Sequence, residues 1–130
     1  MDMNIKEASS LTSVSPDTIR YYERIGLIPP VKRTESGIRT FDEEDLRWIK
    51  FSRQMKHAGL SIDALIEYLS LFRDGEKTVP ARLSLLEEQQ QVLQERINEL
   101  QEAKDRLTFK IENYQTHTAS AEKKLRDFEA

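Results

Sequence analysis

Apolar and polar residues follow helical patterns over most of the chain. Apolar residues at three-residue steps predict an inward-facing stripe formed by Ile5, Ala8 and Leu11. Asn4 followed by Glu7 has the form of a capping box, in which each residue bonds the backbone of the other. These features predict a first helix within residues 1–12.

A second short helix is expected directly after a turn at residues 12–14. Ser15 can cap its first turn, and Pro16 suits the first helical position. Gly26 fits a helix end, and Pro29-Pro30 prevents the helix from continuing. Two short helices joined this tightly are typical of a helix-turn-helix unit.

A small β-hairpin is expected after the two prolines. Two β-prone runs flank the turn-forming cluster Glu35-Ser36-Gly37. Ile38 and Phe41 on the second run favour strands. The hairpin follows the second helix at once, which is the layout of a winged helix-turn-helix.

Two longer helices are predicted next, over residues 42–58 and 61–73. The first begins with the acidic run Asp42-Glu43-Glu44-Asp45, which suits the positive end of a helix dipole, and the second begins at Ser61. The apolar residues expected to pack them together are Leu46, Trp48, Ile49, Leu65, Ile66, Leu69 and Phe72. The acidic run also has the composition of a carboxylate metal site or catalytic site, but the helix start accounts for all of it.

From Val79 onward, apolar residues recur at alternating three- and four-residue steps, which is typical of a coiled coil. The predicted dimerisation seam comprises Val79, Leu83, Leu86, Leu93, Ile97, Leu100, Leu107, Ile111 and Tyr114. Gln90 and Lys104 interrupt it, which costs stability but helps to fix register. Over residues 79–114 the helix is roughly 54 Å long, at about 1.5 Å per residue. One such helix cannot bury its stripe alone, so a second copy of the chain is the simplest partner. The last ten residues are expected to fray, bend or fold back.

Composition narrows the classes of function. The chain has 130 residues, 38% hydrophobic and 33% charged, so a large globular core is not expected. It contains no apolar run near 18 residues and no signal-peptide pattern, so we expect a cytoplasmic protein without a membrane partner. There are no cysteines, and His57 and His117 are far apart in sequence, so no metal and no cofactor are expected.

Positive charge concentrates between residues 20 and 39, although the whole chain has a net charge of −3. This stretch contains five Lys or Arg residues against two Glu residues, a local charge of +3. On the second helix, Arg20, Tyr21 and Arg24 share one outward face. Such a face suits phosphate recognition, whereas an isolated pair of arginines would more often be a solvated helix face.

The stretches TIRYYERIGLIPP and RTESGIRTF, in this order and spacing, closely resemble the MerR family of bacterial transcription regulators. The resemblance runs to about residue 75 and is closest to the short branch that responds to aldehyde and thiol stress. By position it implies DNA contacts from Ser15, Thr18, Arg20 and Tyr21 in the second helix and from Arg33 and Arg39 in the hairpin. Arg24 joins them through the helix-face argument, and Lys56 in the third helix is a weaker phosphate-binding candidate.

The resemblance also implies how the chain works. It implies a homodimer with antiparallel long helices, bound to a near-palindromic operator between the promoter elements that RNA polymerase reads. Members of the family bend and untwist the overlong spacer there, which realigns the two elements. The hairpin departs from the family pattern, because Ile38 and Phe41 stand where two phenolic side chains are usual. We therefore expect the wing to form but to make fewer phosphate contacts.

The effector is the main gap in this interpretation. The resembled branch usually carries a lone cysteine near the position of Gln54, and glutamine can be neither alkylated nor oxidised to a disulfide. The expectation is a small organic effector held without a covalent bond, or a regulator locked in one state. The residues expected to line a pocket between the head and the coiled coil are Trp48, Gln54, Met55, Tyr68 and Phe72. Ordinary core packing is the alternative for each of them.

The predicted fold is therefore mainly all-α. Residues 1–75 form a winged helix-turn-helix DNA-binding head with a small β-hairpin wing, and residues 76–130 form a coiled-coil dimerisation helix. A coiled-coil scaffold without DNA binding is the competing interpretation, but a scaffold has no need of the basic stretch at 20–39. An enzyme is disfavoured, because the sequence offers no nucleophile–base pair, phosphate-cradling glycine loop or metal-ligand spacing.

Overall fold

The computed structural model describes residues 2–129, with the side chains of residues 117, 118 and 127–129 left aside. Contacts divide the chain into two compact units, one reaching to Leu93 and the other starting at Gln94. In chain order the elements are α1 (Ile5–Thr12), α2 (Pro16–Ile25), β1 (Lys32–Arg33), β2 (Arg39–Thr40), α3 (Glu43–Ala58), α4 (Ile62–Arg73), the 3₁₀ turn η1 (Glu76–Thr78), α5 (Val79–Glu112), the π-helical turn η2 (Tyr114–Thr118) and α6 (Ala119–Glu129). The mainly helical fold with a small antiparallel hairpin is as predicted.

The first two helices begin and end where local signals place them. The side chains of Asn4 and Glu7 form the predicted capping box at the start of α1. Ser15 caps α2, with Pro16 in its first turn. Gly26 ends α2 with a left-handed φ of 87°, a conformation that glycine adopts without steric cost.

The inward stripe of α1 differs from the prediction at one position. Ala8 is fully buried and Ile5 is half-buried, but Leu11 is 56% exposed. Thr12 takes the inner position instead, and its hydroxyl donates a 2.8 Å hydrogen bond to the carbonyl of Ala8. A four-residue step from Ala8 therefore continues the buried stripe, where the sequence pattern favoured a three-residue step.

The segment before α1 is extended, so the first helix occupies only residues 5–12 of the predicted range 1–12. Met3 forms an antiparallel bridge with Phe41, through hydrogen bonds of 2.8 and 2.7 Å between their backbones. Both side chains are buried, Phe41 completely. The bridge attaches the start of the head to the base of the hairpin.

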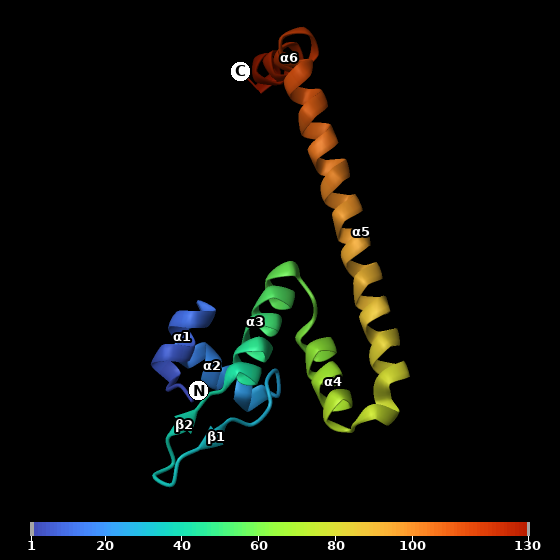
Figure 1. Cartoon of the computed structure of the whole chain (residues 1–130). Coiled ribbons are helices and arrows are strands. Elements are labelled where there is room, and N and C mark those ends of the chain that lie inside the picture. Colours follow the sequence, from blue (N-terminus) through green and yellow to red (C-terminus); the bar gives the residue numbers. More distant parts are fainter. Residues whose placement is uncertain (1, 130) are drawn as a thin grey trace. The chain divides into compact units, whose positions relative to one another are not determined.

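The hairpin pairs Lys32 with Thr40 and Arg33 with Arg39. Figure 1 shows it extending away from the helices of the head as a narrow projection. Each strand has two residues, and the turn between them contains Gly37 at a φ of 85°. Ile38 is 60% exposed, so the hairpin depends on backbone pairing and on Phe41 rather than on a second apolar anchor.

The core of the head lies between α1, α2, α3 and the loop that follows α2. Its largest fully buried side chains are those of Ile19, Leu27, Ile28, Phe41 and Ile49. Leu65 of α4 belongs to the same core, and Leu69 of α4 is also buried. In the loop after α2, the side chains of Leu27, Ile28 and Val31 are buried in this core.

The predicted third and fourth helices are present as α3 and α4. Asp42 and Asp45 form a capping box at the start of α3, and Ser61 caps α4. In the predicted stripe of α4, Leu65 and Leu69 are buried, whereas Phe72 is 41% exposed. Phe72 instead packs edge-on against Trp48 of α3, with ring centroids 5.1 Å apart.

The long helix α5 ends at Glu112, just before the predicted end at Tyr114. A turn at Asn113 and the π-helical turn η2 follow, and the chain changes direction there before α6 (Figure 1). The chain therefore turns before the last ten residues, where fraying, bending or folding back was expected, and the described part of the tail is helical.

Two kinds of site are absent from the described part of the chain. No three His, Cys, Asp or Glu side chains among the described residues are arranged to hold a metal ion. Between residues 2 and 129, no helix combines the length and the apolar character that crossing a membrane requires.

Candidate nucleic-acid interface

Three arginines from the second helix and the hairpin line one hollow in the head. Arg20 of α2, Arg33 of β1 and Arg39 of β2 border a cavity of about 200 Å³, together with residues of α1 and the hairpin turn. The residues come from distant parts of the sequence and meet because the hairpin returns beside α2. The structure therefore brings three of the predicted DNA-binding residues together here.

Arg20 is held only weakly in its present position. Its guanidinium lies 2.9 Å from the Asp17 carboxylate one turn earlier, and these side chains are 44% and 97% exposed. An exposed pair of this kind contributes little to stability, because water and salt screen it. Arg20 can therefore exchange Asp17 for a phosphate or a base edge at small cost.

In the structure, Ser15 and Thr18 take part in capping α2. The Ser15 hydroxyl accepts a 3.2 Å hydrogen bond from the backbone N–H of Thr18 and donates a 2.8 Å hydrogen bond to the Thr18 hydroxyl. Both hydroxyls lie at the N-terminus of α2, where backbone N–H groups suit an anion. Their positions are consistent with phosphate contact, while their present bonds cap the helix.

Tyr21, Arg24 and Lys56 form a second basic group, which combines α2 and α3. The Arg24 guanidinium carbon lies 5.3 Å from the Tyr21 ring centroid, and Lys56 Nζ lies 5.9 Å from the same centroid. Lys56 Nζ is also 5.7 Å from the ring of the buried Tyr22. The structure therefore places Lys56 beside α2, next to the predicted DNA-binding residue Tyr21.

Sequence reasoning missed two further cations on α3. Lys50 and Arg53 are exposed and precede Lys56 at three-residue steps. Burial raises the pKa of Tyr22, and the positive charge of Arg53 offsets part of that rise, so Arg53 acts on the same region of α2. The regular spacing of Lys50, Arg53 and Lys56 was the available signal.

Arg39 and Glu23 form an ion pair that is largely shielded from water. Arg39 Nε donates a 2.9 Å hydrogen bond to Glu23 Oε1, and the side chains are 24% and 15% exposed. The other oxygen of Glu23 accepts a 2.6 Å hydrogen bond from the backbone N–H of Val31. Burial raises the pKa of Glu23, but these two partners outweigh it and hold the pKa below its ordinary value of 4.5.

The wing cations therefore differ in their freedom to meet DNA. Arg39 ties the second strand to α2 through Glu23, and Lys32 lies 2.8 Å from Asp42, whose pKa this contact holds at about 2. Arg33 is exposed, and the one hydrogen bond of its guanidinium to a described residue goes to the carbonyl of Gly37, at 2.9 Å. Of these three side chains, Arg33 has the weakest ties to the head.

The residues predicted for an effector pocket do not share one site. Trp48, Tyr68 and Phe72 belong to an aromatic cluster with Phe51, in which Trp48 and Tyr68 have ring centroids 6.2 Å apart. Met55 and Tyr68 line a cavity of about 210 Å³, whereas Trp48 borders a neighbouring hollow of about 220 Å³. Gln54 is exposed and borders neither of these two.

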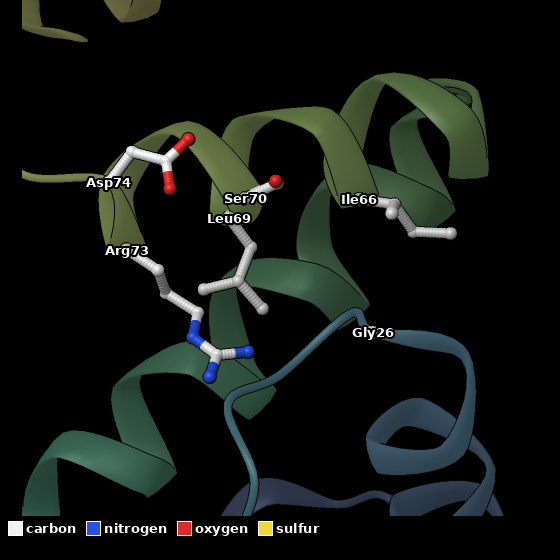
Figure 2. A pocket seen from close by; sticks show the side chains of 6 residues that line it. All are labelled: Gly26, Ile66, Leu69, Ser70, Arg73 and Asp74. Atoms are coloured by element: carbon white, nitrogen blue, oxygen red, sulfur yellow. The ribbon is translucent and has the colours of Figure 1, made fainter.

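A wider hollow of about 420 Å³ lies between the Gly26 turn and α4. Figure 2 shows Leu69 and Arg73 pointing from α4 toward the chain that follows Gly26, with Asp74 pointing the opposite way. One cation and one carboxylate border this hollow, so it does not add to the concentration of positive charge on α2 and α3.

The predicted seam of α5 is largely uncovered within one chain. The exposed members are Val79, Leu83, Leu86, Ile97, Leu100, Leu107, Ile111 and Tyr114, with exposed fractions from 39% to 74%. Leu93 differs, because it packs against the core of the head. Leu85, which lies off the predicted seam, is 9% exposed and is the residue of α5 that the head buries most. Exposed apolar side chains repeated along one helix favour a partner helix.

Comparison with known proteins gives two overlapping family matches. A family described as "MerR HTH family regulatory protein" matches residues 3–71, and one described as "MerR, DNA binding" matches residues 46–108. The HTH-type transcriptional regulator AdhR of Bacillus subtilis is 54% identical over 91 residues, which cover 70% of this chain and 65% of that protein. For three of the curated relatives that it matches, the chain spans between 51% and 65% of their length.

Two solved structures are similar over almost the whole chain. A protein assigned to the MerR family of transcriptional regulators, from Listeria monocytogenes, is 62% identical with a TM-score of 0.86, covering 98% of this chain and 96% of that one. HiNmlR, a MerR family regulator that lacks the sensor domain and was solved bound to promoter DNA, is 32% identical with a TM-score of 0.79. That comparison covers 92% of this chain and 94% of the other.

Proposed function

This chain belongs to the MerR family of helix-turn-helix regulatory proteins, and we propose that it is a transcription regulator that binds promoter DNA as a homodimer. The observation that carries the proposal is the hollow in which Arg20, Arg33 and Arg39 meet. It joins the predicted recognition helix to the wing on one basic surface. A scaffold protein would not need such a surface.

The geometry supports a division of work between two elements. Helix α2 enters the major groove, with Arg20 and Tyr21 toward the bases or phosphates. The exposed guanidinium of Arg33 contacts the neighbouring phosphates from the wing, and the basic side chains of α3 add contacts next to α2. Residues 1–75 are thereby the DNA-binding head, and the helix from residue 76 onward is the dimerisation element.

In this proposal the protein is cytoplasmic, and its dimer binds a near-palindromic operator within a promoter. Bending and untwisting of the spacer would set how well RNA polymerase meets the two promoter elements. A small organic effector, bound without a covalent bond, would change the balance between the two DNA shapes. The complex of HiNmlR with promoter DNA supports the DNA-binding part.

Footprinting on the promoter region of the chain's own gene tests the proposal. The expected result is one protected region with two half-sites in successive major grooves, together with a change in transcript level when RNA polymerase is added. If the DNA stays unprotected at protein concentrations well above those at which ordinary repressors bind their operators, the proposed DNA binding is wrong.

A further inference from the structure

Mostly apolar side chains line a partly open cavity of about 210 Å³ between α3, α4 and the start of α5. The whole cavity lies within the unit that ends at Leu93. Its lining consists of Phe51, Met55, Leu60, Ala64, Leu65, Tyr68, Leu85, Leu86, Gln89, Gln90 and Leu93. Among these described residues there is no charged side chain.

The size of the cavity matches a small organic molecule. A cavity of about 150 Å³ lined by aliphatic and aromatic side chains stays dry and binds benzene. A somewhat larger volume accepts a substituted benzene or a fused two-ring molecule. Met55 lies in the wall, and an unbranched thioether side chain adapts to occupants of different shape.

The chemistry of the wall also excludes whole classes of ligand. A charged molecule would lose its hydration without gaining an ionic partner, which is costly in an apolar site. The polar groups of the lining are the Tyr68 hydroxyl and the amides of Gln89 and Gln90. They suit a molecule with one neutral hydrogen-bonding group at the most.

We propose that this cavity binds a small, uncharged aromatic molecule and that the molecule is the effector of the regulator. The inference rests on the proposed function and names the chemical class of its effector. The binding site is formed by Met55 and Tyr68 from the predicted set, together with Phe51, Ala64 and Leu65. Gln54 and Trp48 lie outside it.

The position of the cavity explains how binding would reach the dimer. Leu60 and Leu65 belong to the core of the head, while Leu86, Gln90 and Leu93 occupy seam positions of α5. One molecule in the cavity therefore touches the core of the DNA-binding head and the dimerisation helix at once.

Direct binding to the full-length chain tests this inference without DNA. The chain is labelled with ¹³C at its methionine methyl groups, and toluene is added as the neutral probe, with benzoate as a charged probe of similar shape. We expect a saturable shift of the Met55 methyl signal with toluene, and at least tenfold weaker binding of benzoate. Equal binding of both probes, or no shift with toluene, overturns the inference.

Two variants of Ala64 and one control locate the bound probe. Ala64 is 8% exposed and lines the cavity, so Ala64→Met fills it and Ala64→Val fills part of it. Toluene binding should be lost with the first and weakened several-fold with the second. Ala81→Met, on the exposed surface of α5 and outside the cavity, should bind toluene as the native chain does. Native affinity in a folded Ala64→Val chain would overturn the assignment, even if Ala64→Met failed to fold.

A gel shift on the operator separates this inference from the proposed function. Toluene binding without DNA binding would leave the cavity assignment standing and remove the regulator. DNA binding without toluene binding would leave the regulator standing and remove the cavity assignment. If both occur, toluene should change the transcript level in the reaction with RNA polymerase, and an unchanged level would overturn its role as effector class.

Discussion

At the scale of single residues, the arginines of the head differ in the partners they already have. Arg20 shares an exposed contact with Asp17, whereas Arg39 is bound to Glu23 in a shielded pair. Breaking the first contact is cheap, and breaking the second leaves a partly buried carboxylate without its cation. We therefore expect replacement of Arg20 and replacement of Arg39 to have different effects, although both side chains lie beside the same hollow.

Replacement of Arg20 by alanine should weaken operator binding without unfolding the head. If Arg20 reads a base, the expected loss is about 1–3 kcal/mol on the operator and much less on unrelated DNA. If it contacts phosphate, the loss should be similar on both, with a shallower dependence on salt. Gel shifts at two salt concentrations distinguish these cases.

Arg47 offers a matched control for Arg20. It forms the same kind of exposed contact one turn from its partner, 2.8 Å from Glu44, but at the start of α3. Arg47→Ala should leave DNA affinity within experimental error. Equal losses from the two variants would mean that general charge, rather than the position of Arg20, determines binding.

Replacement of Glu23 by glutamine should destabilise the head in a pH-dependent way. At neutral pH the lost contacts with Arg39 and Val31 are expected to cost about 1–3 kcal/mol. Because the folded pKa of Glu23 is lowered, its contribution is complete above the ordinary value of 4.5 and is lost as the pH falls through the folded pKa. The difference between native and Glu23→Gln chains should therefore shrink in acid.

Urea unfolding followed by circular dichroism between about pH 7 and pH 3 measures this difference. Arg39→Ala should reproduce most of the loss at neutral pH, because it removes the same pair. A difference that grows as the pH falls would contradict the sign of the pKa shift.

Candidate DNA-binding residues could be predicted from the sequence because helix periodicity places them on a face. The spacing of Arg20, Tyr21 and Arg24 within one helix was enough to predict that they share a face. The pairing of Arg39 with Glu23 could not be predicted in this way, since it depends on the path of the loop between α2 and the hairpin. Lys50 and Arg53 could have been predicted from spacing alone.

At the scale of elements, one buried hydrogen bond joins α3 to the loop after α2. The Ser52 hydroxyl donates a 2.9 Å hydrogen bond to the carbonyl of Leu27, and both side chains are almost fully buried. Leu27 lies directly after Gly26, where α2 ends. The bond therefore fixes the angle at which the chain leaves α2.

Ser52→Ala should cost about 1–3 kcal/mol of folding free energy, because the Leu27 carbonyl loses its partner in a buried site. Ser70→Ala, at an exposed position of α4, should stay within about 0.5 kcal/mol of the native chain. Calorimetric unfolding of both variants tests this. A neutral Ser52→Ala variant would mean that water or the loop itself replaces the lost bond.

Helix ends were predictable because their causes are local, and long-range packing was not. Asn4, Ser15 and Ser61 lie within a turn of the groups that they cap. The bridge joins Met3 to Phe41, which are far apart in the sequence, so no local pattern predicts it. Burial of Thr12 in place of Leu11 could not be predicted for the same reason, because the elements packed against α1 decide which of its side chains face inward.

At the scale of the whole molecule, the seam of α5 is the feature that one chain cannot satisfy. Leu100 and Leu107 are 62% and 61% exposed, and both belong to the unit that starts at Gln94. Leu93 is a poorer probe of dimerisation, because its replacement would also disturb the head. The heptad pattern anticipated the seam, but the contact of Leu93 with the head depends on tertiary packing.

The double variant Leu100→Asp with Leu107→Asp should be monomeric. Charged side chains at two seam positions oppose burial against a partner helix, while leaving the head unchanged. Light scattering should give the mass of one chain, and operator binding should fall to the level of a half-site. A dimeric mass at low micromolar concentration would contradict this prediction.

Phe109 provides the control for the seam. It is 64% exposed but lies two residues after Leu107, off the predicted seam. Phe109→Asp should remain a dimer. Loss of the dimer in this variant alone would move the interface to another face of α5.

The aromatic cluster on α3 and α4 has a practical consequence for optical experiments. Trp48 is the single tryptophan of the sequence, and its ring lies within 6.2 Å of three other aromatic rings, all in the first compact unit. Its fluorescence emission therefore reports unfolding of the head, whereas far-ultraviolet ellipticity reports the helices of both units together. Stopped-flow mixing with denaturant, recorded by both signals at several protein concentrations, would time the loss of the head separately from separation of the chains. A concentration-independent tryptophan phase beside a concentration-dependent ellipticity phase would identify the head as an autonomous folding unit.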